Sequence, residues 1–85
     1  MKKSTPRTII YKKGTGVIEF PDKCLAATVY NKGAVDVIVD ESETLAQTEA
    51  YPYPVMAGYY LTGSVKIHEV TTGNVSVHLR CVVEV

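Results

Sequence analysis

Residues 75–85, Val-Ser-Val-His-Leu-Arg-Cys-Val-Val-Glu-Val, carry an apolar side chain at every odd position. A period of two places those side chains on one face of an extended strand and the polar ones on the other face. A long strand with one dry and one wet face is typical of an antiparallel sheet that packs one side on a core. This pattern constrains the fold class and leaves the chemistry open.

Short glycine-containing stretches separate pairs of such segments, which predicts three β-hairpins. The predicted hairpins comprise residues 7–20, 24–40 and 65–85, with turns at 13–16, 31–33 and 71–73. In a three-residue hairpin loop the last residue adopts the left-handed conformation, so we expect positive φ at Gly33 and Gly73. The register that keeps the apolar side chains of both strands on one face then pairs Ile67 with Val77.

Six to seven short strands at intervals of roughly ten residues favour an all-β fold, a small antiparallel β-sandwich or barrel built from hairpins. The 85 residues make one domain, 1–85. Residues 41–58 are the least regular, and alternate prolines there suit an edge strand or a crossing between sheets. A domain of this size has a thin stability margin, which favours association with copies of itself or with a partner.

The first seven residues are basic but no apolar stretch follows them, so we expect no signal peptide, and no segment is long enough to span a membrane. Synthesis in the cytoplasm is the resulting expectation. Cys24 and Cys81 allow one disulfide; without an export signal, two reduced and at least partly buried thiols are the preferred interpretation.

The charges sum to zero but are unevenly distributed along the chain. Residues 1–33 carry a net charge of +5, and residues 34–64 carry −5 with no basic residue. Two interpretations remain open: the segments neutralise each other as neighbours in the sheet, or they form opposite poles that support head-to-tail contact between copies.

No group of residues predicts a reaction. His68 and His78 would be diagonal neighbours on the outer face of one predicted hairpin, but a zinc site needs three or four ligands. Cys81 is expected on the dry face, where a thiol is inert, and no base is placed beside Cys24. We therefore predict no enzyme activity, no cofactor and no metal.

Aromatic residues and prolines concentrate in one segment, which is the first candidate interaction site. It comprises Tyr51, Pro52, Tyr53, Pro54, Tyr59 and Tyr60. Stiffly held tyrosines suit a protein contact, and a sugar-binding platform is the alternative; some of the rings could instead plug one end of the core. The acidic surroundings argue against nucleic acid.

The basic residues Lys2, Lys3 and Arg7 form the second candidate site. The basic first thirteen residues could bind phosphate. Alternatively, they form an arm that lies on a neighbouring copy, with residues 1–6 as the possible arm, or a free tail.

The segment 27–37, Ala-Thr-Val-Tyr-Asn-Lys-Gly-Ala-Val-Asp-Val, followed by Gly-Ser-Val-Lys-Ile at 63–67, resembles small β-sandwich modules of tailed-phage virions, such as head decoration, head-fibre and tail components. The resemblance implies a structural protein that self-associates, often as trimers, and attaches to a larger assembly. No functional residue is carried over, because no site motif matches.

Overall fold

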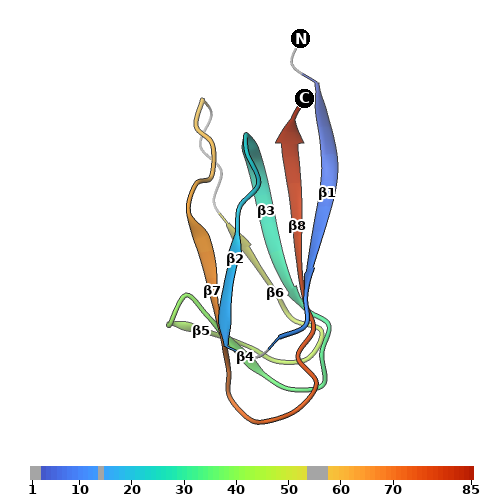
Figure 1. Ribbon diagram of the computed structural model, residues 1–85, viewed down its shortest axis with the longest axis vertical. Helices are drawn as coiled ribbons and strands as arrows, with labels where there is room; N and C mark the ends of the chain where they lie inside the picture. The colour runs from blue at the N-terminus through green and yellow to red at the C-terminus, as the bar shows by residue number, and fades with distance from the viewer. Residues whose placement is uncertain (1–2, 14, 54–57) are drawn as a thin grey trace.

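The computed structural model describes residues 3–13, 15–53 and 58–85, which form two packed four-stranded antiparallel sheets (Figure 1). Sheet A has the order β1 (Ser4–Tyr11), β8 (Val77–Glu84), β3 (Cys24–Asn31), β6 (Ala50–Tyr53). Sheet B has the order β2 (Gly16–Glu19), β7 (Ser64–Glu69), β4 (Val37–Val39), β5 (Glu43–Leu45). The predicted all-β sandwich is confirmed, with eight strands in the described residues. No helix in these residues could cross a membrane.

The three predicted hairpins are wrong. At each one the chain crosses from one sheet to the other, because β1, β3 and β8 belong to sheet A and β2, β4 and β7 to sheet B. Alternation fixes which side chains are dry. It does not fix whether the next strand lies beside the first or opposite it, since the same side chains face the core in both arrangements.

A different pair of strands, β4 and β5, forms a hairpin with Val37 opposite Leu45. The chain reverses at Asp40 and Glu41, which have φ values of 52° and 64°. The Ser42 N–H donates to the Val39 carbonyl at 3.2 Å. Two successive positive φ values are the pattern of a type I′ turn, whose twist suits a hairpin.

Gly33 and Gly73 do not adopt the left-handed conformation expected of them. A Cβ on Gly33 would lie 2.6 Å from both the Asn74 carbonyl oxygen and the Ser76 nitrogen. The glycine is needed because two backbone segments approach closely here, and not because the turn requires a positive φ. A Cβ on Gly73 would similarly lie 2.5 Å from Val35 Cγ1.

The core lies between the two sheets and contains the side chains that alternation assigned to the dry face. Its buried members are Ile18, Cys24, Ala27, Val29, Val37, Val39, Leu45, Val65, Ile67, Val75, Val77, Leu79 and Cys81. A register shift between Cys24 and Ala26 turns Cys24 inward. At the far end of β8 the core thins: Val83 is half-buried and Val85 is exposed.

Asn31 is the one fully buried polar side chain of the described residues, and it organises the crossing from β3 to β4. Its Nδ2 donates to the Val35 and Leu45 carbonyls, each at 2.9 Å, and its Oδ1 accepts from the Gly33 N–H at 3.0 Å. One amide thus satisfies three backbone groups on both sides of the crossing. Because an unpaired buried polar group costs about 1–3 kcal/mol, this arrangement stabilises the crossing strongly.

We expect Asn31→Ala to lower the free energy of unfolding by about 3 kcal/mol, because three buried backbone groups lose their partner. Asn31→Asp is expected to be at least as damaging, since a carboxylate cannot donate to the Val35 and Leu45 carbonyls. Urea unfolding followed by circular dichroism measures both. Asn74→Ala, in an exposed loop, is the matched control and should change stability by less than about 0.5 kcal/mol; equal losses in all three variants would contradict the role given to Asn31.

Candidate interaction surfaces

The tyrosine–proline segment does not form a single platform. The rings of Tyr51 and Tyr53 pack against the core, with their centroids 5.3 Å apart at an interplanar angle of 89°. Tyr59 and Tyr60 are 68% and 43% exposed. Pro52 lies in β6, an edge strand of sheet A, as alternate prolines predicted, and Pro54 lies outside the described residues.

Tyr53 links the two sheets through a polar contact. From β6 in sheet A, its hydroxyl donates to Asp40 Oδ2 at 2.6 Å, and Asp40 Oδ1 accepts from the Lys66 N–H in sheet B at 3.0 Å. Burial, followed by the neighbouring Asp40 carboxylate, raises the pKa of Tyr53. The ring also meets Phe20 edge-on at 5.3 Å. Tyr53 therefore has a structural role.

Tyr60 makes a contact at the end of sheet A where β3 begins and β8 ends. Its hydroxyl donates to Glu84 Oε2 at 2.8 Å, and the neighbouring Leu61 N–H donates to the Cys24 carbonyl. These contacts hold residues 60 and 61 beside β3 and β8, and the ring of Tyr59 remains exposed.

The basic N-terminal residues do not form one site in the structure. Lys2 lies outside the described residues, and the Lys3 carbonyl accepts a hydrogen bond from the Val85 N–H at 2.9 Å. Residues 4–6 pair with β8 of the same chain, and Arg7 is an exposed residue of β1 opposite Cys81. Residues 4–6 are therefore strand, neither an arm on another copy nor a free tail.

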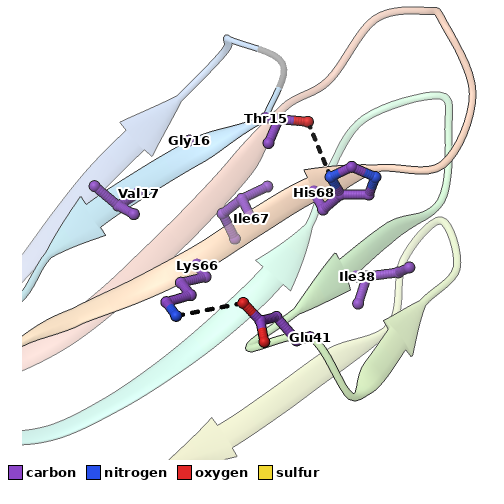
Figure 2. A pocket seen from close by; sticks show the side chains of 8 residues that line it. All are labelled: Thr15, Gly16, Val17, Ile38, Glu41, Lys66, Ile67 and His68. Atoms are coloured by element: carbon purple, nitrogen blue, oxygen red, sulfur yellow. Dashed lines mark hydrogen bonds and ion pairs between the residues drawn. The ribbon is translucent and has the colours of Figure 1, made fainter.

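A groove of about 440 Å³ lies on the outer face of sheet B (Figure 2). Val17 and Ile38 line it from β2 and β4, and Lys66 and His68 line it from the central strand β7. Lys66 Nζ pairs with Glu41 Oε1 at 3.3 Å, but both side chains are well exposed. Such a pair contributes little to stability, about 0–1 kcal/mol.

His68 and His78, expected side by side, lie in different sheets. His68 Nδ1 lies 3.2 Å from Thr15 Oγ1, the distance of a hydroxyl–imidazole hydrogen bond. A catalytic hydroxyl also needs a base oriented by a third group. Within the described residues, no such partner of His68 is found, and no three His, Cys, Asp or Glu side chains gather where they could hold a metal.

Cys24 and Cys81 are both free thiols and both buried, as the sequence predicted. Burial raises the pKa of Cys81 to about 12, and burial also raises the pKa of Cys24. Because the thiolate is the nucleophile, neither cysteine has the environment of a reactive thiol.

The central part of the outer face of sheet A, called here the sheet A face, is a grid of three neighbouring strands; Glu84, at the end of β8, lies on the same side of the sheet but beyond this grid. It comprises Pro6, Thr8 and Ile10 of β1, His78, Arg80 and Val82 of β8, and Ala26, Thr28 and Tyr30 of β3. Arg80 at its centre is the one residue of the grid that always carries a charge. Ile10 is 55% exposed and Val82 is 38% exposed. A shallow hollow of about 270 Å³ adjoins Val82.

Two cations flank the aromatic ring of this face. The Arg80 guanidinium carbon lies 4.8 Å from the centroid of the Tyr30 ring, and Lys32 Nζ lies 5.5 Å from it. Both distances are within the range of cation–π contacts. Arg80 has no carboxylate partner among the described residues, so its charge is open to a ligand or another protein.

Both edge strands of sheet A carry a proline, Pro6 in β1 and Pro52 in β6. The Lys3 carbonyl accepts from β8 and the Glu49 carbonyl accepts from β3. Pro6 lies three residues after Lys3, and Pro52 lies three residues after Glu49. Because the backbone groups of successive strand residues point to opposite sides, those of both prolines point away from the neighbouring strand, towards the open edge of the sheet. Because proline has no N–H, it weakens the pairing of another strand at both edges.

No family model, curated protein or solved structure matches this chain. The sheet A face is the surface that sequence reasoning missed. Its signal was the lack of charge at the outward positions of residues 6–10 and 26–30, which was visible only once the strands to which they belong were known.

Tyr53→Phe is expected to lower the free energy of unfolding by about 2 kcal/mol, because it removes a hydrogen bond to a carboxylate that joins the two sheets. Tyr60→Phe removes an exposed hydroxyl–carboxylate bond, which water can replace, and should lower the free energy of unfolding much less. Urea unfolding of both variants gives the comparison. A larger loss of stability for Tyr60→Phe than for Tyr53→Phe would contradict the structural role given to Tyr53.

Stability should fall as the pH rises above about 8.5, the pKa of an unfolded thiol. Both thiols have a raised pKa when folded, so their contribution is complete below the unfolded pKa and is lost above it. For Cys81 the loss is roughly 1 kcal/mol one pH unit above that value, and Cys24 adds to it in the same direction. Chemical unfolding at pH 7 and pH 9.5 measures it. The Cys24→Ala, Cys81→Ala double variant should show a flatter pH dependence, and an unchanged dependence would contradict the assignment.

Proposed function

We propose that this chain is a non-enzymatic structural protein that self-associates and docks on a larger assembly through the sheet A face. The observation that carries the proposal is the composition of that face, where Ile10 and Val82 are exposed and Arg80 alone is permanently charged. The outward side of a half-buried antiparallel sheet is normally polar. A face with so few charges and with exposed apolar side chains is typical of a protein–protein contact.

Two further features support contact through a face. Pro6 and Pro52 hinder strand addition at the two edges of sheet A, which leaves the face as its accessible surface. The molecule is also elongated, 45 Å long and about 20 Å across. A long sheet on a small domain offers more contact area than a compact domain of the same mass.

A component of a tailed-phage virion is the specific form of this proposal. It is supported by the resemblance of residues 27–37 and 63–67 to virion modules and by the sandwich fold that those modules share. The sugar-binding alternative required several tyrosines on one platform. Tyr51 and Tyr53 are engaged in the core instead, so we do not develop it further.

Light scattering coupled to size-exclusion chromatography tests the proposal between about 1 µM and about 200 µM. We expect the wild type to exceed the monomer mass of 9.3 kDa. Val82→Glu, which places a negative charge on the sheet A face, should shift the protein to the monomer because burying an unpaired charge is costly. A monomeric wild type at every concentration would refute the proposal.

Val17→Glu is the matched control, since Val17 is 53% exposed and lies on the outer face of sheet B. It should leave the oligomer intact, and circular dichroism should show that both variants are folded. If Val17→Glu dissociates the oligomer and Val82→Glu does not, the contact lies on sheet B.

A further inference from the structure

Three acidic residues lie close together in one hairpin at an edge of sheet B. Residues 34–64 contain five acidic and no basic residues. Three of the five, Asp40, Glu41 and Glu43, lie in or beside the turn of the β4–β5 hairpin. Figure 1 shows this hairpin at the side of the molecule away from β1. β5 is the edge strand of sheet B, so the hairpin is open to a neighbour.

The carboxylates of this hairpin are only partly used within the chain. Asp40 binds Tyr53 and the Lys66 backbone, and Glu41 makes an exposed ion pair with Lys66. The side chain of Glu43 is exposed and makes no hydrogen bond or ion pair with any described residue. The segments of opposite charge therefore do not neutralise each other here.

The sheet A face has the complementary character. Arg80 occupies its centre and Lys32 adjoins Tyr30, and neither cation has a carboxylate partner among the described residues. Opposite charges on two different surfaces of one molecule favour contact between copies in a head-to-tail sense.

A two-fold stack of the sheet A face on itself is less favourable. An axis through the centre of the grid would place Arg80 against Arg80 of the second copy, and like charges across an interface repel. An axis displaced along β8 would bring Arg80 towards Glu84 of the second copy, but Glu84 already accepts the Tyr60 hydroxyl. The hairpin carboxylates are the better partner for Arg80.

We infer that the sheet A face binds the acidic β4–β5 hairpin of a second copy, with Arg80 and Lys32 of one copy facing Glu43 and Glu41 of the other. This inference rests on the self-association proposed above and names its two surfaces. A contact between two different surfaces is heterologous. It produces a closed ring if the rotation between copies closes, and a filament if it does not.

Charge reversal with light scattering tests the contact. Arg80→Glu and Glu43→Lys should each weaken association by about tenfold or more, because each places like charges across the interface. The double variant R80E/E43K restores the attraction and should associate within about threefold of the wild type. Raising NaCl from about 0.05 M to about 0.5 M should weaken the wild-type oligomer.

Lys23→Glu and Glu19→Lys are the matched controls, because they make the same charge changes at exposed positions outside both surfaces. They should associate like the wild type. A second double variant, R80E/E84K, separates the two geometries. If it restores association and R80E/E43K does not, the contact is two-fold and the inference is overturned.

The outcome also separates this inference from the proposed function. An oligomer that neither Arg80→Glu nor Glu43→Lys weakens would overturn the head-to-tail contact and leave self-association standing. A wild type that remains monomeric at every concentration would overturn both.

Discussion

The buried amide of Asn31 is the interaction on which the architecture most depends. It lies where the chain leaves sheet A for sheet B, and it satisfies backbone groups of residues 33, 35 and 45. A turn sequence that would ordinarily close a hairpin is thereby held as a crossing between sheets. The close backbone approach at Gly33 completes this arrangement, because no side chain fits between residues 33 and 74–76.

With the crossings fixed, the two sheets have different outer surfaces. Sheet B presents a groove whose cation is paired with Glu41. Sheet A presents a face with one permanent charge, and prolines protect both its edges. An exposed apolar face combined with protected edges favours specific contact through the face, and it disfavours uncontrolled pairing of edge strands. This difference between the sheets underlies the proposed assembly role.

The tyrosine–proline segment shows how one sequence pattern divides in three dimensions. Tyr51 and Tyr53 lie on either side of Pro52 in β6. Because side chains alternate between the two faces of a strand, both rings face the core. Tyr59 and Tyr60 follow in a segment without a long strand and remain exposed. Aromatic clustering in the sequence therefore indicated one surface, but the strand geometry placed its members in two environments.

The sequence alone determined the all-β class, the inward face of most strands and the burial of both thiols, and it excluded a central position for the strand that contains Pro52. These features depend on side-chain alternation, residue polarity and the missing N–H of proline. Only the tertiary structure decided which strands are neighbours. A hairpin and a crossing between sheets bury the same side chains, so the choice depends on distant partners: the Leu45 carbonyl for Asn31, and residues 74–76 for Gly33. The sheet A face likewise joins residues 6–10, 26–30 and 78–82, whose common surface exists only after β8 inserts between β1 and β3.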